Sequence, residues 1–284
     1  MSLIRPARWL LVVAALALAG GGLVSGCSRG ANAKPPRKRA HGHYATLNGI
    51  RIYYEDRGHG PALFLLHGGV GNGMQFDQQA PVFAQSHRVI VPDACAQGRT
   101  SDRADSLTYH AMAEDVIGLM DHLKIKQADI MGWSDGGVTA LDVAMNHPDR
   151  VDHIVTFGAN FRSDGLNPPD RLWNQTATAD SFGADMKKGY EELAPDPGHY
   201  AISMNRVIAL WRDQPNYTEA DLGRIRAKVL IAAGEHDVIR PDHTEALAKA
   251  IPGATLWIVP GGSHSVMQEQ PELVNRTVLE FLAH

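Results

Sequence analysis

The sequence contains little cysteine, with only Cys27 and Cys95 among 284 residues. A chain of this length can bury a substantial core without disulfide crosslinks. It also lacks a metal-ligand cluster, a phosphate-binding loop, a dinucleotide motif, a sequence repeat and a nucleic-acid-binding module, and we therefore expect no cofactor and no bound metal. The run Gly68–Gly73 is glycine-rich, but it has no lysine of the kind that a nucleotide loop requires.

Acidic residues are absent from the first 43 positions, which hold seven basic ones. The remaining residues carry 20 basic and 31 acidic side chains, a net charge of −11. An acidic domain argues against nucleic acid as a partner and mildly favours neutral or cationic ligands. Solubility alone also explains such a charge, and nothing in the sequence indicates an obligate protein partner.

Residues 1–26 have the layout of a signal peptide. Arg5 and Arg8 precede an unbroken apolar run from Trp9 to Ala19. The apolar stretch up to Val24 is short for a membrane-spanning helix, which needs roughly 20 residues. Residues 23–27, Leu-Val-Ser-Gly-Cys, resemble a bacterial lipobox, in which the cysteine is lipidated and becomes the new N-terminus. The alternatives are an ordinary signal peptide or an uncleaved anchor.

Residues 27–43 are predicted to be a flexible basic tether, because they are rich in proline, glycine and basic residues and show no apolar period. The lipobox resemblance implies a lipid-anchored protein of the bacterial cell envelope, periplasmic or on the outer surface, that contacts the membrane through this anchor. If Cys27 carries lipid, no internal disulfide can form. Cys95 is then expected to be a small buried hydrophobe.

From residue 44 onward, short apolar runs alternate with longer helical patterns, which predicts an α/β fold. The expected strands are residues 50–56, 62–67, 88–93, 128–132, 153–158, 228–234 and 254–260. Most are continuous apolar runs, typical of a parallel sheet covered on both faces. We expect about eight strands, mostly parallel and twisted, with helices on both faces. Helices are predicted at about 108–123, after Ser134, and from Pro271.

The region from about 161 to 222 breaks this alternation, because it contains helical patches, prolines and several aromatic residues but no convincing strand. We predict a helical cap inserted within the 44–284 domain. Such insertions at the carboxyl edge of a parallel sheet often cover the ligand site.

One serine lies between glycines where a strand meets a helix. Gly132, Trp133, Ser134, Asp135 and Gly136 fit the pattern G-x-S-x-G of a nucleophile elbow. The glycines allow close packing of strand and helix, and the helix N-terminus favours developing negative charge near the hydroxyl. The alternative is that Ser134 only caps the helix.

A serine hydroxyl needs a base, and the expected chain order in this fold is Ser, then Asp or Glu, then His. Asp237 follows one predicted strand and His264 follows the next, so both are expected at the carboxyl edge with Ser134. Glu235 and Asp242 are alternatives to Asp237. His264 would take the proton of Ser134, Asp237 would orient the imidazole, and water would hydrolyse the acyl-enzyme.

The oxyanion of the tetrahedral intermediate needs two backbone N–H donors. One is expected from Asp135, the residue after the nucleophile. The other is expected from Gly69, in the His-Gly-Gly loop that follows the strand at residues 62–67.

From about Tyr44 to its end, the chain resembles the α/β-hydrolase superfamily. The motifs GWSDGGVTAL, FGAN and GEHD are similar to those of the valacyclovir hydrolase (biphenyl hydrolase-like) branch. This resemblance implies that the Asp135 side chain helps to recognise the α-amino group of a substrate. The alternative is that Asp135 only structures the elbow.

The sequence departs from these relatives in the loop at residues 94–99, which lacks the usual Arg-Gly-His-Gly-like run, and in the cap. The substrate pocket is therefore not defined. Trp133 is the first candidate to line it, together with Phe161, Trp173 and Trp211, and aromatic core packing is the alternative for each.

Three functions remain open at this stage. The first is a serine hydrolase of small carboxylic esters, including aminoacyl esters. The second is a hydrolase of amides or carbon–carbon bonds with the same triad. The third is a surface lipoprotein that binds a small ligand and has lost catalysis. An epoxide hydrolase or dehalogenase is disfavoured, because those enzymes carry aspartate at the position of Ser134.

Overall fold

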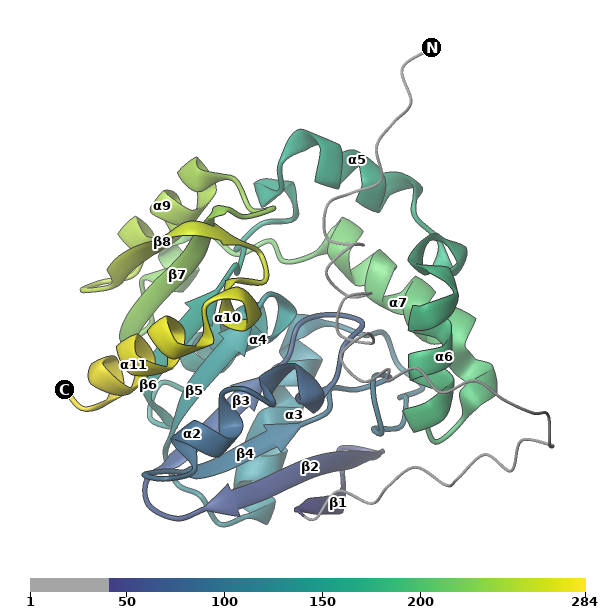
Figure 1. The fold of residues 1–284 in the computed structure, drawn as a ribbon, viewed down its shortest axis with the longest axis horizontal. Coiled ribbons are helices and arrows are strands. Elements are labelled where there is room, and N and C mark those ends of the chain that lie inside the picture. Colours follow the sequence, from purple (N-terminus) through teal and green to yellow (C-terminus); the bar gives the residue numbers. More distant parts are fainter. Residues whose placement is uncertain (1–40) are drawn as a thin grey trace, which may run out of the picture.

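The computed structural model describes residues 41–284. The predicted signal peptide, the lipidation of Cys27 and most of the predicted tether fall on residues 1–40 and lie outside this range. Figure 1 shows a twisted central sheet with helices on both faces, which confirms the predicted α/β architecture.

Eight strands form one sheet in the order β1-β2-β4-β3-β5-β6-β7-β8. The strands are β1 Gly42–Leu47, β2 Ile50–Gly58, β3 Ala62–Leu66, β4 Arg88–Pro92, β5 Ala128–Trp133, β6 Val151–Phe157, β7 Lys228–His236 and β8 Thr255–Ser263. The pairs β1–β2 and β2–β4 are antiparallel, and all later pairs are parallel. The carboxyl ends of the parallel strands therefore meet at one edge, where catalytic groups of this architecture lie.

Helices cover the sheet on two sides. The helices of the core are α2 Ala80–Phe83, α3 Tyr109–His122, α4 Asp135–Asn146, α8 Glu219–Leu222, α9 Pro241–Ala250, α10 Val266–Glu269 and α11 Pro271–Leu282, with the short 3-10 turn η1 Gly73–Phe76. Side chains of α3, α4 and α9 pack in one apolar core, and those of α2, α10 and α11 pack in a second core on the opposite face. The central strands are apolar on both sides because both of their faces are buried.

The strand β1 corrects the predicted end of the tether. Gly42 and His43, which the sequence assigned to the tether, pair with Glu55 and Tyr54 of β2. The ring of His43 stacks on that of Tyr54, with 5.5 Å between the centroids. The domain therefore begins two residues earlier than expected, because hairpin pairing continues beyond the last apolar residue.

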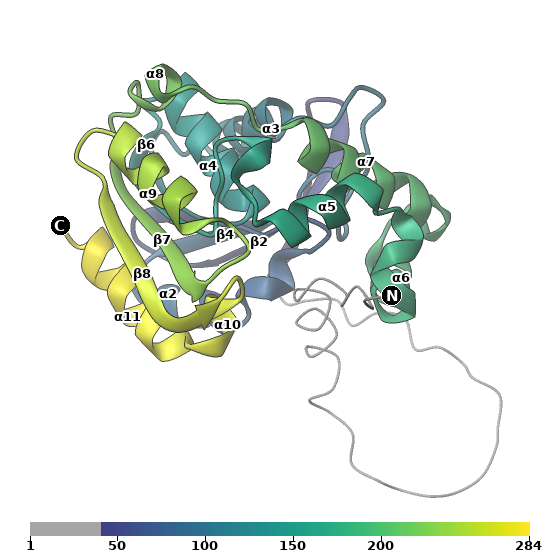
Figure 2. The same cartoon turned by 90° about the horizontal axis from the view of Figure 1, so that it is seen from above.

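Between β6 and the core helix α8 the chain forms helices but no strand of the sheet. They are η2 Ser163–Gly165, α5 Pro168–Thr176, η3 Ala179–Phe182, α6 Gly183–Leu193, η4 Pro197–His199 and α7 Tyr200–Asp213. Figures 1 and 2 show α5, α6 and α7 grouped at one end of the molecule, away from β8 and α11. We call this segment the cap.

The two ends of the cap lie together. Arg162 and Asn216 form an isolated antiparallel bridge. The N–H of Tyr217 donates to the carbonyl of Phe161 at 2.9 Å, and the N–H of Ser163 donates to that of Pro215 at 2.7 Å. The cap therefore leaves and re-enters the core at one point. Within residues 41–284, no helix has both the length and the apolarity needed to cross a bilayer.

Candidate active site

Ser134 lies on a sharp turn between β5 and α4. Its backbone has φ 52° and ψ −118°, and its hydroxyl makes no capping hydrogen bond to the helix. A positive φ in a residue with a side chain is strained and is typical of functional positions. The elbow glycines are required sterically: a Cβ on Gly132 would lie 2.2 Å from the carbonyl oxygen of Gly136. The geometry matches a nucleophile elbow rather than a simple helix cap.

His264 and Asp237 form a buried pair beside this elbow. Nδ1 of His264 lies 2.7 Å from Oδ1 of Asp237, and both residues are buried. Burial acts to lower the pKa of His264, but the nearby carboxylates, Asp237 first, outweigh it and leave this pKa above its ordinary value. This contact fixes the ring so that Nε2 is the nitrogen left to act as a base.

The two alternatives to Asp237 lie elsewhere. The carboxylate of Glu235 is exposed and accepts the N–H of Gly261 at 2.8 Å. Asp242 is exposed at the start of α9 and pairs with Arg240 at 3.1 Å. Of the three carboxylates proposed from the sequence, only Asp237 contacts His264 in the described part of the chain.

Trp133 contacts the loop that carries His264. Its indole N–H donates to the carbonyl of His264 at 2.7 Å, and its ring lies 5.7 Å from the imidazole centroid. The two residues are 131 positions apart in the sequence. This bond connects the strand before Ser134 to the loop that carries His264, so Trp133 helps to position His264. Its predicted contact with substrate stays a prediction.

Replacing Trp133 by phenylalanine is expected to lower kcat/KM for esters about fivefold, because it removes a buried hydrogen bond worth about 1 kcal/mol while keeping an aromatic ring. Steady-state kinetics with a thermal melt would measure this. Trp257→Phe is the control, since that ring packs against Phe157 rather than His264. Full activity in Trp133→Phe would show that the bond has no positioning role.

The predicted oxyanion loop lies against the elbow. A Cβ on Gly68 would be 3.3 Å from Cβ of Ser134, and one on Gly69 would be 2.3 Å from Oδ2 of Asp135. A side chain at position 69 would collide with the Asp135 carboxylate and the Trp211 ring, so the backbone of Gly69 lies against the side chains of these two residues. The roles of the Gly69 and Asp135 N–H groups as oxyanion donors stay predictions.

His67 holds this loop in place. Its Nε2 accepts the N–H of Ala94 at 2.8 Å, so its Nδ1 carries the proton and donates to the carbonyl of Gly68 at 2.7 Å. Burial lowers the pKa of His67, which favours this neutral form. The side-chain oxygen of Gln75 accepts the N–H of Gly68 at 3.0 Å. These contacts hold the backbone of the loop that lies against Ser134.

The Asp135 carboxylate connects the elbow to the cap. Both of its oxygens lie 2.9 Å from the indole nitrogen of Trp211 on α7, and Oδ1 also accepts the hydroxyl of Tyr109 at 2.8 Å. Burial raises the pKa of Asp135, although these donors oppose the rise. The sequence did not indicate either partner. The predicted contact of Asp135 with a substrate ammonium stays a prediction, and it would have to coexist with these bonds.

The first cap helix is anchored on the loop that carries Asp237. Asn167, which precedes α5, donates its side-chain amide to the carbonyl of Asp237 at 2.9 Å, and its N–H donates to that of Val238 at 2.8 Å. Leu166 and Ile239 form a bridge next to these bonds. The start of α5 is therefore held close to the pair Asp237–His264.

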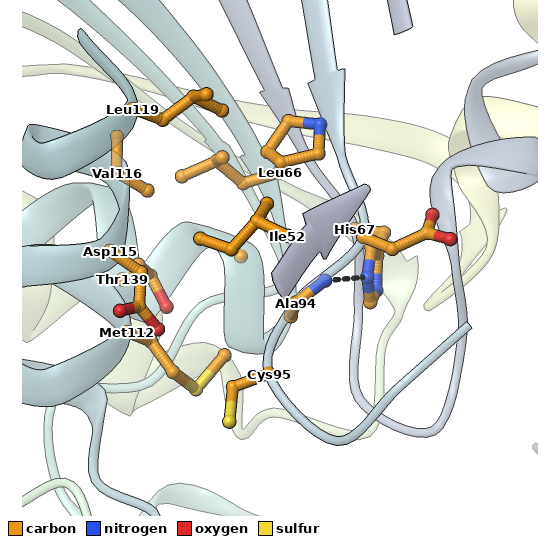
Figure 3. A pocket seen from close by; sticks show the side chains of 13 residues that line it. Ile52, Leu66, His67, Ala94, Cys95, Met112, Asp115, Val116, Leu119 and Thr139 are labelled. Atoms are coloured by element: carbon orange, nitrogen blue, oxygen red, sulfur yellow. Dashed lines mark hydrogen bonds between the residues drawn. The ribbon is translucent and has the colours of Figure 1, made fainter. Parts of the chain in front are cut away.

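A small cavity lies behind the elbow, between β-strand ends and the helices α3 and α4. Figure 3 shows Cys95, Met112, Val116, Leu119 and Thr139 around it, with the Ala94–His67 bond at its edge. Its volume is about 30 Å³, which is room for a water molecule and too little for a substrate. Ser134, Asp237 and His264 do not line it. This cavity is a packing feature and not the substrate pocket.

Cys95 is buried at this cavity, as expected for a small hydrophobe. Burial raises the pKa of its thiol to about 11, against the opposing effect of Arg103, whose Nε lies 3.3 Å from the sulfur. A thiol in this state is a poor nucleophile at neutral pH. In residues 41–284 no group of three or more His, Cys, Asp or Glu side chains is placed to hold a metal ion.

The fold and the serine elbow define an α/β hydrolase, and comparison with known proteins supports this class. The model of the alpha/beta hydrolase family matches residues 63–277, so the chain belongs to this family. The resemblance noted from the motifs is thereby confirmed.

Individual relatives differ in their named activities. The putative carbamate hydrolase RutD of Caulobacter sp. (strain K31) is 29% identical over 266 residues, covering 84% of this chain and 97% of the relative. Serine hydrolase BPHL of Mus musculus is 27% identical over 250 residues, covering 84% of each chain.

Among solved structures, the meta-cleavage product hydrolase CumD of Pseudomonas fluorescens IP01 superposes with a TM-score of 0.72 at 25% identity. The match covers 85% of this chain and 97% of that one. The chain is therefore a hydrolase of the α/β family that resembles the BPHL branch. The names of its relatives refer to the hydrolysis of different kinds of bond.

Proposed function

We propose that this protein is a serine hydrolase that cleaves small carboxylic esters through an acyl-enzyme on Ser134. The observation that carries the proposal is the 2.7 Å contact of His264 Nδ1 with Asp237 Oδ1 beside a strained serine elbow. In this reaction His264 removes the Ser134 proton, and the oxygen attacks the ester carbonyl. His264 then protonates the leaving alcohol, and water releases the acid.

Two parts of the site support an acyl-transfer reaction. The loop Gly68–Gly69 is fixed by His67 and Gln75 next to the elbow, where two N–H groups can stabilise an oxyanion. The pKa of His264 is raised by Asp237, which favours proton transfer from the serine.

A second candidate is hydrolysis of a carbon–carbon bond or of a carbamate or amide. It is favoured by the structural likeness to CumD, named as a meta-cleavage product hydrolase, and by the similarity to RutD, named as a putative carbamate hydrolase. The same triad serves all of these reactions, since the fold does not select the bond.

The test is a substrate panel on the full chain: p-nitrophenyl butyrate, butyranilide and a vinylogous diketone, each with wild type and Ser134→Ala, and a fluorophosphonate label. We expect ester turnover and labelling, both lost in Ser134→Ala. Turnover of the diketone or anilide without the ester would favour the second candidate. No serine-dependent turnover and no labelling would leave a ligand-binding protein.

We also propose, from the sequence alone, that Cys27 carries a lipid that anchors the enzyme to the bacterial cell envelope. The likeness of residues 23–27 to a lipobox supports this. Cys27→Ser is the variant that separates lipidation from an uncleaved anchor, since only a lipoprotein would lose metabolic labelling with palmitate.

A further inference from the structure

The residue that follows the nucleophile has a buried carboxylate between the sheet edge and the cap. Asp135 is 3% exposed and is the first residue of α4. Its carboxylate accepts the indole N–H of Trp211 from α7 and the hydroxyl of Tyr109 from the start of α3. A buried carboxylate is costly unless it is hydrogen-bonded. The first turn of α4 is therefore held by one side chain of the core and one of the cap.

The Trp211 ring also lies against the loop after β3. A Cβ on Gly69 would be 2.6 Å from Cζ2 of Trp211. One side chain of the cap therefore contacts both Asp135 and Gly69, the residues predicted to donate to the oxyanion. These residues follow β5 and β3, which are neighbours in the sheet. The relative position of the two predicted donors thus depends on where Trp211 lies.

The helix α7 is fixed at a second point on the sheet edge. The hydroxyl of Ser203 donates to the carbonyl of Ala96, and Nη1 of Arg206 donates to the carboxylate of Asp102 at 2.9 Å. Ser203 and Trp211 are eight residues apart, about 12 Å along a helix, and two strand spacings are about 10 Å. The helix therefore reaches from the loop after β4, across β3, to the elbow after β5. Trp211 occupies its place only when the cap is docked.

We propose that Tyr109 and Trp211 are positioning residues for catalysis, which act through the Asp135 carboxylate to hold the two predicted oxyanion donors at the spacing that the reaction needs. Turnover then requires the cap to be docked on the elbow. The inference rests on the proposed serine hydrolase reaction, but not on the choice of an ester as its substrate. Donors stabilise an oxyanion strongly because they are already in place when the charge develops. In this role the Asp135 carboxylate acts within the protein and not on a substrate group.

The experiment uses two conservative variants of the full chain. Trp211→Phe removes the indole N–H and keeps a ring near Gly69, and Tyr109→Phe removes only the hydroxyl. Each should lower kcat for p-nitrophenyl butyrate about tenfold and change KM less than about twofold, because the lost stabilisation belongs to the transition state. The double variant should approach the ~10²–10³-fold loss caused by a missing oxyanion donor.

A second readout reports on the oxyanion itself. A trifluoromethyl ketone of matched chain length adds to Ser134, and its carbonyl oxygen becomes the oxyanion of the adduct while the serine proton passes to His264. Its Ki should rise in each variant by the same factor by which kcat/KM falls. Rates are divided by the end point of fluorophosphonate labelling, so that unfolded chains are not counted.

Tyr200→Phe is the matched control. It also removes a cap hydroxyl, but this one donates to the carbonyl of Ala179 at 3.2 Å, within the cap. Its kcat, KM and Ki should stay within about twofold of wild type. The inference would be overturned if Trp211→Phe and Tyr109→Phe kept their kcat, if they changed KM alone, or if kcat fell without a rise in Ki.

Failure of the proposed function has a different signature. If wild type cleaves butyranilide or the diketone instead of the ester, the same variants are measured on that substrate, and the same loss of kcat would retain the inference while rejecting the ester. Serine-dependent ester turnover with unaffected variants would reject the inference alone. A wild type that neither turns over a substrate nor reacts with the fluorophosphonate would reject both.

Discussion

Asp237→Asn is expected to lower kcat for ester hydrolysis by about 10⁴ while the fold persists, by analogy with triads in which the same change is known to act in this way. In the wild type, Nδ1 of His264 lies 2.7 Å from Oδ1 of Asp237. The asparagine can keep a contact with Nδ1, but it cannot hold the ring in the tautomer that leaves Nε2 as a base. It also removes the charge that stabilises the imidazolium. Kinetics on p-nitrophenyl butyrate, with a thermal melt for folding, would measure both effects.

The same variant has a defined pH signature. The proposed mechanism needs neutral His264, and the pKa of His264 is raised by Asp237 against the effect of burial. The acid limb of kcat/KM should therefore lie above the ordinary histidine range in wild type and move to lower pH in Asp237→Asn. Glu235→Gln is the control, because that carboxylate is exposed and bonds to Gly261. If Glu235→Gln lost as much activity, the acid would be wrongly assigned.

Gly158→Ala is expected to reduce turnover by at least about 10²-fold, since small displacements of catalytic groups have effects of this size. Gly158 follows β6 with φ +61°, and a Cβ there would lie 2.6 Å from Nδ1 of His264 and 3.0 Å from Oδ2 of Asp237. The methyl group would push the base away from its acid. Activity and labelling by fluorophosphonate would both fall.

Backbone strain must be separated from this collision, because alanine at positive φ costs about 1–2 kcal/mol by itself. Gly253 is a matched control: its φ is +73°, and a Cβ there meets no atom within 4 Å. Gly253→Ala should lose stability but retain activity. If both variants lost activity to the same degree, the effect would come from strain and not from the triad.

The sheet and the elbow could be predicted because their signals are local. Continuous apolar runs indicate strands with two buried faces. Thr108 and Pro271 indicate the starts of two helices, which the structure confirms as α3 and α11. The order of Ser134, Asp237 and His264 follows from strand ends that meet at one edge. Residue positions that follow from the regular topology could therefore be predicted from the sequence.

The strand β1 was missed, although its turn was present. Asn48 and Gly49, with φ of 50° and 76°, form the two-residue turn that joins β1 to β2. Asn-Gly is the strongest short hairpin signal, and it would have revealed the strand. The six residues of β1 mix polar and apolar side chains without a clear alternation, so they did not predict a strand by themselves.

The surroundings of the elbow could not be predicted, because they depend on contacts across the fold. Asp135 was interpreted through family resemblance as an ammonium-binding group, yet its bonds go to Tyr109 and Trp211, 26 and 76 residues away. No local pattern reports such pairs.

The meeting of the two cap ends at Arg162 and Asn216 has an evolutionary consequence. The chain leaves the core after β6 and returns to it before β7 at adjacent positions. The residues between Arg162 and Asn216 can therefore change in length and sequence without altering the strand order of the sheet. The cap can then be exchanged as one contiguous gene segment while the strand ends that carry Ser134, Asp237 and His264 stay constant. A graft between homologues needs only two junctions, and both lie on one short bridge.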